Sequence, residues 1–346
     1  MTDPSFFFAF GRPFSPLYSL AMRLRERAYR RGLFQRHQLP VPVISVGNLV
    51  LGGSGKTPTV AAICRHLLAS GEKPAVVSRG YGGQAKAAVN VVADGEKNFL
   101  DARAAGDEPY MLATMLPGVA VLTGRRRILP CQRAVSMGGT VLVLDDGFQH
   151  LAVRRDLDLA LFNATTLAGN SRVFPGGELR EPVAALRRAD AFVLTGVDGR
   201  NHERAGRFAD LLEKRFPGKP VFQTQHILDA FVDQHGQAVT PPPAPFLAVS
   251  AIAHPERFHR LLERAGMTLA GHLNFLDHHR YPPDAIERIG REVKKRGAAA
   301  VIVTEKDRVK LAERSLPYPL LAVRITAVLP SELLALIDAA VAVSQR

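Results

Sequence analysis

A short glycine-rich loop constrains the fold of this chain more than any other feature of its sequence. The loop follows a β-branched run at 41–46 and precedes a helical run at 59–69. In the order strand, glycine loop, helix, backbone N–H groups surround phosphate oxygens, a lysine adds positive charge and a threonine can bind Mg²⁺. Val50 replaces the first glycine that is usual in such loops. The order of elements still predicts a nucleotide-binding loop, formed by Val50, Leu51, Gly52, Gly53, Ser54, Gly55, Lys56 and Thr57.

A loop of this kind predicts a second feature, an apolar strand that ends in an acidic residue beside the magnesium ion. The apolar run 141–144 is followed by Asp145 and Asp146. These two acids could instead be ordinary turn residues after a strand. The glycine loop and the acidic strand end are separate signals of the same fold, which favours metal binding by these acids. We therefore predict a site for ATP and Mg²⁺ in which Thr57, Asp145 and Asp146 bind the metal.

From residue 41 onward, short β-branched runs alternate with helical stretches. This pattern predicts an α/β protein with a mainly parallel, P-loop NTPase-like sheet and helices on both faces. Near 225–245 the pattern changes, because 231–239 resembles a hairpin and a proline-rich stretch follows it. A second strand and helix series then begins. The expected parts are a basic N-terminal segment at 1–38, a P-loop core domain at 39–225, a hairpin and proline-rich linker at 226–245, and a smaller α/β domain at 246–346.

Strands and one helix are expected at defined places in these two domains. In the core domain the expected strands are 41–46, 74–78, 119–122, 141–144, 157–162 and 191–194. In the smaller domain they are 246–250, 299–304 and 320–325, with a helix near 255–265.

Positive charge is concentrated at the N-terminus. The 346 residues carry a formal net charge of +13, which predicts anionic partners. Residues 1–38 hold seven arginines against two acidic residues, and Leu17, Leu20 and Leu24 follow helical spacing from Ser15. An amphipathic helix of this kind suits the interface of an anionic membrane, where each basic residue adds about 1 kcal/mol. Alternatively, the helix packs on its own domain with a solvated basic face.

The remaining composition excludes several classes of protein. No apolar run approaches the ~20 residues that a membrane-spanning helix needs, and the N-terminus lacks a signal-peptide pattern. Two cysteines, Cys64 and Cys131, are too few for a disulfide framework. We therefore expect a protein of the reducing cytosol that is neither exported nor membrane-spanning.

Further motifs can be read together with the glycine loop. They are Val46-Gly47-Asn48-Leu49, Ser78-Arg79-Gly80-Tyr81-Gly82-Gly83, Gly106-Asp107-Glu108-Pro109, Asp145-Asp146-Gly147-Phe148-Gln149-His150 and Phe174-Pro175-Gly176-Gly177-Glu178-Leu179-Arg180-Glu181-Pro182. Their order and sequence resemble the tetraacyldisaccharide 4′-kinase family of lipid A biosynthesis over roughly residues 10–330. The resemblance implies ATP-dependent phosphorylation of the 4′-hydroxyl of a tetraacylated disaccharide 1-phosphate. The product would be lipid IVA, made at the cytoplasmic face of the bacterial inner membrane by a peripheral protein.

The resemblance also implies roles that spacing alone leaves open. Lys56 would stabilise the transferred phosphoryl group, Asp107 would accept the proton of the sugar hydroxyl, and His278 in the motif 275–281 would assist Asp107. From the residues alone, Asp107 is equally well an N-cap, and 275–281 is equally well a surface loop. If His278 assists, the smaller domain must close over the core domain. The candidates for substrate binding, each of which could be a solvated charge, are Arg79, Glu108, Gln149, His150, Arg180 and Glu181.

Two other classes of function fit parts of the sequence. A P-loop GTPase or ATPase that switches a partner would explain Thr304-Glu305-Lys306-Asp307, which resembles a base-reading motif. A plain turn at the end of a strand explains the same residues. A nucleic-acid-binding module fits the net charge, but the sequence lacks a basic stripe interleaved with aromatic residues. We therefore expect a monomeric kinase without a nucleic-acid partner.

Overall fold

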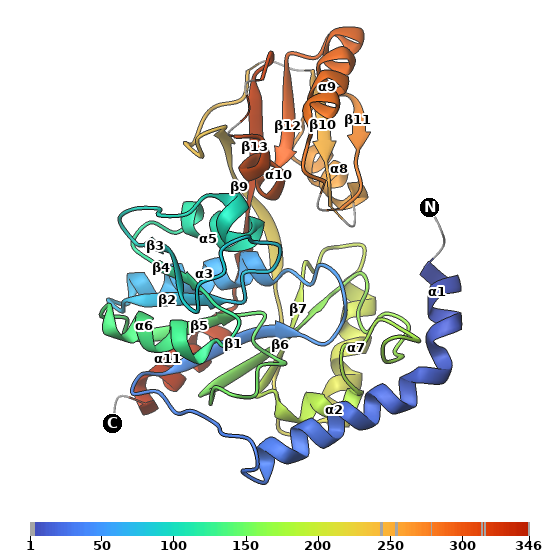
Figure 1. Ribbon diagram of the computed structural model, residues 1–346. Coiled ribbons are helices and arrows are strands. Elements are labelled where there is room, and N and C mark those ends of the chain that lie inside the picture. The colour runs from blue at the N-terminus through green and yellow to red at the C-terminus, as the bar shows by residue number, and fades with distance from the viewer. Residues whose placement is uncertain are drawn as a thin grey trace.

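Two β-sheets divide the chain into a larger and a smaller α/β domain (Figure 1). The computed structural model describes residues 4–242, 245–252, 255–277, 279–312, 314 and 316–344. The larger domain contains an eight-stranded sheet in the order β3-β4-β2-β5-β1-β6-β7-β8. β3 is antiparallel to β4, and the other neighbours are parallel. The mainly parallel sheet predicted from the sequence is therefore confirmed.

The strands of the larger sheet coincide with the predicted runs to within a few residues. β3 and β8 have no counterpart among the predictions. The strands are β1 (Val43–Asn48), β2 (Pro74–Ser78), β3 (Asn90–Asp94), β4 (Ala120–Thr123), β5 (Val141–Asp145), β6 (Leu157–Asn163), β7 (Ala191–Thr195) and β8 (Val221–Gln223).

Helices cover both faces of the larger sheet, as predicted. Every residue of β1, β5 and β6 is buried, which is expected where parallel strands are covered on both sides. α3 (Lys56–Ala69), α5 (Asp107–Met115) and α11 (Ser331–Ser344) contribute side chains to the core on one face. α6 (Ile128–Ser136) and α7 (His202–Arg215) pack against the other face. Short helical segments are α4 (Ala102–Ala105) and η2 (Val183–Arg188).

The smaller domain is a five-stranded sheet in the order β11-β10-β12-β13-β9. Its strands are β9 (Gln225–Asp233), β10 (Phe246–Ser250), β11 (Leu269–Asn274), β12 (Ala300–Thr304) and β13 (Leu320–Val328). Side chains of α9 (Pro283–Arg296) and α10 (Glu305–Leu311) join the core on one face, and α8 (Pro255–Arg264) packs on the other. The second α/β domain predicted from the sequence is present.

The connection between the domains differs from the predicted linker at 226–245. β9 begins two residues after β8 ends and pairs antiparallel with β13, from Gln225 opposite Val328 to Asp233 opposite Leu321. A tight turn follows, in which the N–H of Asp233 donates to the carbonyl of Gln237 at 2.9 Å. The predicted hairpin is therefore present, but its first arm is a full strand of the smaller sheet. Residues 243 and 244 of the proline-rich stretch lie outside the described residues.

The C-terminal helix also departs from the predicted boundary. α11 follows β13 in sequence, yet Leu333, Ile337 and Val341 are buried in the core of the larger domain. β13 itself reaches α3, where Arg65 Nη1 donates to Thr326 Oγ1 at 3.2 Å. The chain thus passes between the domains twice, once between β8 and β9 and again between β13 and α11.

The N-terminal helices lie along the outside of the larger domain (Figure 1). They are α1 (Pro4–Gly11), the short η1 (Arg12–Phe14) and α2 (Ser15–Arg30). In the part of the chain that the structure describes, no helix is both long enough and apolar enough to span a membrane.

We expect Ile337→Ala to lower the free energy of unfolding of the larger domain by about 2–5 kcal/mol, because it leaves a cavity in a core that α11 completes. Val343→Ala in the same helix is the matched control, since that side chain is 74% exposed. Urea denaturation of both variants measures the difference. Equal effects of the two substitutions would contradict the assignment of α11 to this core.

Candidate active site

The glycine loop joins the end of β1 to the start of α3, as its sequence predicts. Gly55 has φ +74°, and a Cβ there would lie 2.7 Å from Thr195 Oγ1 and 2.8 Å from His226 Cε1, so no other residue fits without a shift. On the opposite side, the N–H of Leu51 donates to the carbonyl of Glu178 at 2.7 Å. The loop is therefore held between β7, β9 and the segment 172–180.

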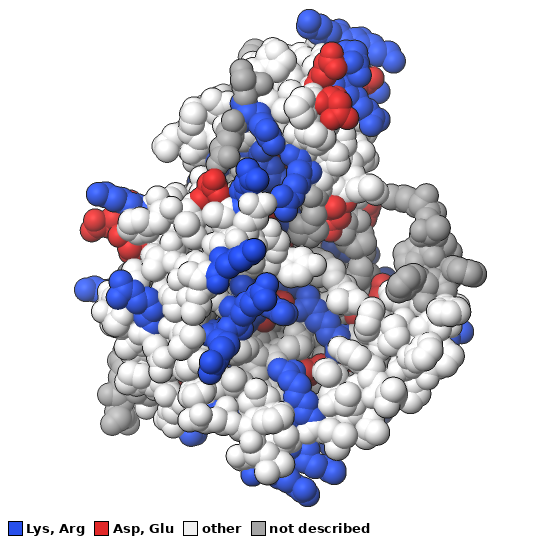
Figure 2. All heavy atoms as spheres, viewed as in Figure 1, with Lys and Arg blue, Asp and Glu red and all other residues white. Residues whose placement is uncertain are grey.

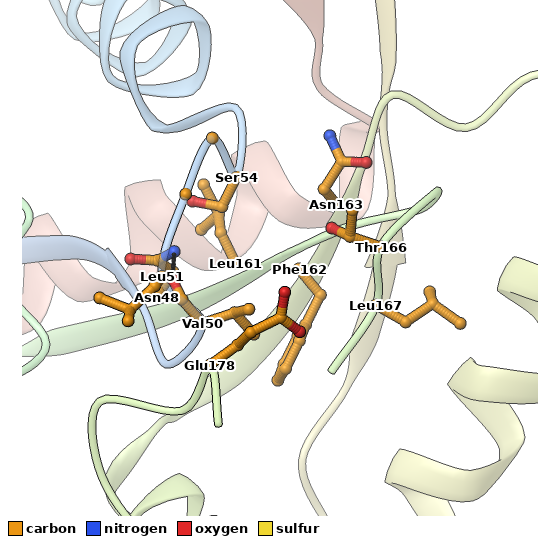
Figure 3. A pocket seen from close by; sticks show the side chains of 12 residues that line it. Asn48, Val50, Leu51, Ser54, Leu161, Phe162, Asn163, Thr166, Leu167 and Glu178 are labelled. Atoms are coloured by element: carbon orange, nitrogen blue, oxygen red, sulfur yellow. Dashed lines mark hydrogen bonds between the residues drawn. The ribbon is translucent and has the colours of Figure 1, made fainter. Parts of the chain in front are cut away.

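An open cavity adjoins the glycine loop on the side of β6 (Figure 3). Figure 3 shows Asn48, Val50 and Ser54 on one wall and Asn163, Thr166 and Leu167 on the other. A ligand whose phosphates bind the loop would therefore lie next to a cavity of mixed polar and apolar lining.

Asn48 at the end of β1 connects the strand to the loop. Its Nδ2 donates to the carbonyl of Val50, and its Oδ1 accepts from Lys56 Nζ at 3.1 Å. Its own carbonyl accepts from Gln149 Nε2 at 2.9 Å. The motif Val46-Gly47-Asn48-Leu49 does not by itself predict this role of Asn48. The signal was a polar side chain, buried here, at the end of an apolar strand directly before the loop.

Asp146 lies at the centre of a cluster of positive charges. Its carboxylate is 3.4 Å from Lys56 Nζ and accepts from Arg180 Nη1 at 2.7–2.8 Å, and its carbonyl accepts from Arg127 Nη1 at 2.8 Å. Burial alone would raise the pKa of Asp146, but Lys56 and Arg180 outweigh it and hold the pKa at about 2. Asp146 is therefore ionised at neutral pH. Arg127 is itself buried, so it supports the backbone of Asp146 from inside the domain.

Asp145 is in a different environment one residue earlier. The side chain is 1% exposed, and its Oδ1 has no hydrogen-bond partner among the described residues. Burial, with the nearby carboxylates of Glu108 and Asp146, raises the pKa of Asp145 to about 7. A carboxylate in this position is stabilised in its charged form by a cation, so the donor set fits Mg²⁺.

A magnesium ion here would be held only in part by the protein. Among the residues that the structure describes, no group of three or more His, Cys, Asp or Glu converges into a metal cage. Mg²⁺ commonly uses one or two carboxylates together with substrate phosphates and water. Thr57 in the first turn of α3 and the two adjacent acids suit that arrangement.

Asp107 and Glu108 form the first turn of α5. The N-cap is Gly106, at φ +95°, and a Cβ there would lie 2.6 Å from the carbonyl of Tyr81. The alternative that Asp107 is the N-cap therefore does not hold. Asp107 Oδ2 is 3.6 Å from Lys310 Nζ of α10, and the charge of Glu108 acts on Asp145. The packing of α5 thus brings these two acids to the edge of the sheet where β1 and β5 end.

The predicted substrate-binding residues divide into two groups. Gln149 and Arg180 contact Asn48 and Asp146 beside the loop, and exposed Arg79 acts electrostatically on His150. Burial, with Arg127 and Arg155 among the nearby arginines, lowers the pKa of His150 to about 3, so its imidazole is neutral. Figure 2 shows that lysine and arginine side chains gather on the face at the junction of the domains.

Glu181 differs from these residues. It is 3% exposed, pairs with Arg188 and lies 4.0 Å from Arg25 of α2. These contacts anchor the N-terminal helix, because Arg188 also lies 3.3 Å from Glu26 of α2.

His278 lies outside the described residues. Its neighbours are described: Asp277 Oδ1 is 3.6 Å from Lys306 Nζ, and the ring of His279 stacks on Phe275 with centroids 4.6 Å apart. Asp277 therefore lies near the start of α10, where Lys306 also approaches Glu108 of α5.

We expect Asn48→Ala to weaken nucleotide binding by about tenfold or more, because Lys56 loses a charge-assisted hydrogen bond that orients it. Isothermal titration with ATP and Mg²⁺ measures the change. Asn90→Ala is the control: Asn90 lies in β3 at the far edge of the sheet, where it donates to the carbonyl of Ala87 at 3.2 Å. An unchanged affinity in the Asn48 variant would contradict this role.

Comparison with known proteins gives one consistent result. The sequence model of a family described as tetraacyldisaccharide-1-P 4′-kinase matches residues 8–342. A tetraacyldisaccharide 4′-kinase of Desulfotalea psychrophila is 48% identical, over 94% of each chain. One of Syntrophotalea carbinolica is 44% identical over 90% of this chain and 85% of the relative. A crystal structure of LpxK from Aquifex aeolicus in complex with ATP superposes with a TM-score of 0.77 at 29% identity, covering 95% of this chain and 98% of that one.

Proposed function

We propose which residues of this chain carry each part of the catalysed reaction. The chain belongs to the tetraacyldisaccharide-1-phosphate 4′-kinase family. Its reaction is the ATP-dependent phosphorylation of the 4′-hydroxyl of a tetraacylated disaccharide 1-phosphate, a step of lipid A biosynthesis. One observation carries the assignment of residues. The glycine loop, Asp145, Asp146 and the start of α5 meet where the parallel strands β1 and β5 end.

The glycine loop and Lys56 bind the phosphates of ATP in this proposal. Backbone N–H groups at the start of α3 would face the anionic oxygens of the phosphates. The ammonium of Lys56 would stabilise the negative charge of the phosphoryl group during its transfer. Thr57, Asp145 and Asp146 would hold Mg²⁺, which neutralises charge on the phosphate oxygens when bound. Arg180 and Lys56 keep Asp146 ionised and in place.

Asp107 is the general base of the proposal. As the 4′-oxygen bonds to the γ-phosphorus, the bond between that phosphorus and the β–γ bridging oxygen breaks, and ADP leaves with the electron pair. The hydroxyl proton passes to the carboxylate of Asp107. Because a carboxylate is a weak base for an alcohol, this transfer occurs late, when the hydroxyl has become acidic. His278, delivered by the smaller domain, assists Asp107.

Arg79, Gln149, His150 and Arg180 are proposed to bind the disaccharide and its 1-phosphate. Support comes from the position of Gln149 and Arg180 beside the loop, from the charge of Arg79 that acts on His150, and from the density of positive charge on this face (Figure 2). We assign Glu181 a different task from the one expected: it holds α2 through Arg25 and Arg188. Glu108 is proposed to act electrostatically on Asp145, because its negative charge raises the pKa of that carboxyl group.

The N-terminal helix is proposed to bind the surface of an anionic membrane. α2 contacts the larger domain through polar groups: Ser15 Oγ donates to the carbonyl of Val173 at 2.8 Å, and Tyr18 donates to that of Arg180 at 3.1 Å. Its leucines are on the outside. Leu17 is 69% exposed, and Leu20 and Leu24 are each 52% exposed.

This arrangement is the reverse of an amphipathic helix that packs on its own domain. Such a helix buries its leucines and exposes its charges. Here exposed apolar side chains lie next to exposed arginines of the same segment, Arg23, Arg27 and Arg30. A surface that combines both suits a lipid interface, which takes up apolar side chains and attracts positive charge. The acyl chains of the substrate would then be presented from the same membrane.

We expect Asp107→Asn to lower formation of the 4′-phosphorylated product by about 100-fold or more, with ATP affinity unchanged. Mass spectrometry of the lipid, after incubation with ATP and Mg²⁺ in detergent, measures the product. Asp210→Asn, at an exposed position of α7, is the control. A partner-switching ATPase or GTPase would instead hydrolyse nucleotide without lipid and tolerate Asp107→Asn, so that result would contradict the proposal.

We expect replacement of Leu17, Leu20 and Leu24 by serine to lower binding to anionic phospholipid vesicles by at least about tenfold, because the buried apolar area is lost. Vesicle sedimentation measures the bound fraction, and ATP affinity is expected to stay constant. Leu211→Ser is the control, since Leu211 is a 54% exposed leucine of α7. Unchanged vesicle binding in the triple variant would mean that α2 is only structural.

A further inference from the structure

α10 lies at the junction of the two domains (Figure 1). Its side chains contribute to both cores. Val309 packs in the core of the larger domain and Leu311 in that of the smaller one. Arg308 Nη2 donates to Thr114 Oγ1 at 3.2 Å, near the C-terminal end of α5, while Lys310 contacts Asp107 at its start. The short helix α10 is therefore docked along α5.

The start of α10 explains the Thr-Glu-Lys-Asp motif. Thr304 Oγ1 donates to Asp307 Oδ2 at 2.7 Å and accepts from the N–H of Asp307, so Thr304 is an N-cap. The same carboxylate accepts from the N–H of Ala251 at 3.1 Å. The motif thus begins a helix at the end of β12, where the strand-end alternative predicted a plain turn. Asp307 is fully buried and rigidly held.

Lys310 extends from this fixed carboxylate to the proposed base. Its side chain is 5% exposed, and its Nζ lies 3.5 Å from Asp307 Oδ1 and 3.6 Å from Asp107 Oδ2. A buried ammonium is costly unless it is paired, so its position is determined by the two carboxylates. Since Asp307 is buried and held by hydrogen bonds from Thr304 and Ala251, Lys310 restrains Asp107.

Lys306 makes the corresponding contacts one helical turn earlier. Its Nζ is 3.8 Å from Glu108 and 3.6 Å from Asp277, the residue before His278. Residues four apart lie on the same face of a helix, so the two lysines present one positive surface to the start of α5. That surface joins Asp107 and Glu108 of the larger domain to the segment that carries the proposed histidine.

We propose that Lys310, with Lys306, positions the general base of the phosphoryl transfer and couples it to docking of the smaller domain. The inference rests on the proposed role of Asp107. Lys310 acts through Asp107 and does not touch substrate. Lys310 holds one carboxylate oxygen of Asp107 so that the other oxygen faces the 4′-hydroxyl. Small displacements of a reacting group can lower a reaction rate about 100-fold. Lys306 holds Asp277 of the smaller domain near Glu108 of α5.

Docking of α10 itself has a separate basis. Glu305 accepts from Arg308 Nε at 2.6 Å and from Arg324 Nε at 2.9 Å, and Arg308 also reaches Thr114. This buried cluster joins α10 to β13 and α5 without the lysines. A substitution of Lys310 is therefore expected to change catalysis more than domain packing.

The test is a double-mutant cycle with Lys310→Met and Asp107→Asn, read in single-turnover product formation. In the wild-type background, Lys310→Met is expected to lower kcat by about 10–100-fold, with the KM for ATP within about twofold. In the Asp107→Asn background it is expected to have no further effect beyond about twofold, because its target is already removed. Lys310→Arg is expected to recover part of the loss. Lys294→Met, at an exposed position of α9, is the control.

A purely structural role predicts a different result, namely equal losses from Lys310→Met in both backgrounds and a parallel fall in thermal stability. That result would overturn the inference. If Lys310→Met does not fold, the same cycle with Lys310→Arg is read by the same rule. An inactive wild-type protein would contradict the proposed function itself, whereas an active one with additive losses would contradict only the positioning role.

Discussion

The site depends on how negative charge is held at the end of the parallel sheet. Asp145 is buried and the adjacent Asp146 is half-buried, and two carboxylates in that position repel each other. This repulsion is offset at Asp146, because Lys56 and Arg180 bind its carboxylate and Arg127 donates to its carbonyl. Within the described ranges of the chain, no group donates a hydrogen bond to the buried Oδ1 of Asp145, which favours a bound cation. The interactions that assemble the loop, β5 and the segment around Arg180 therefore also prepare a place for metal and phosphate.

Coupling between the domains follows from the path of the chain. β9 and β13 form one antiparallel pair that begins beside the glycine loop and ends in the smaller sheet, and α11 then returns to the larger core. His226 on β9 lies against Gly55. Movement of the β9–β13 pair is therefore linked by contact to movement of the glycine loop. α10 adds a second link, because its side chains belong to both cores. A reaction that must exclude water from a phosphoryl group benefits from domains joined in this way.

The net charge of +13 is divided between different tasks. Some arginines, such as Arg188 and Arg155, are largely buried and neutralise buried acids. Arg25 joins α2 to the larger domain, whereas Arg23 and Arg27 stay exposed beside leucines. The apolar exposed face of α2, more than the number of charges, distinguishes a membrane surface from nucleic acid as the anionic partner that we propose.

Local patterns in the sequence determined most strands of the larger domain, the helices on both faces and the glycine loop between β1 and α3. They could do so because buried parallel strands are apolar runs, and because the carboxyl ends of neighbouring strands meet at one edge. Lys56 and Asp146 could therefore be expected near each other from their positions after β1 and β5.

Other features were decided only by tertiary structure. β9 alternates between half-buried and exposed residues, and its partner β13 lies far away in sequence. The apolar residues of α11 do not reveal which core they enter. Nothing near Glu181 or Lys310 in the sequence indicates that one meets Arg188 and the other Asp107. Such pairings are selected by burial and charge neutralisation between distant segments, and a local pattern carries no information about which distant segment will supply the partner.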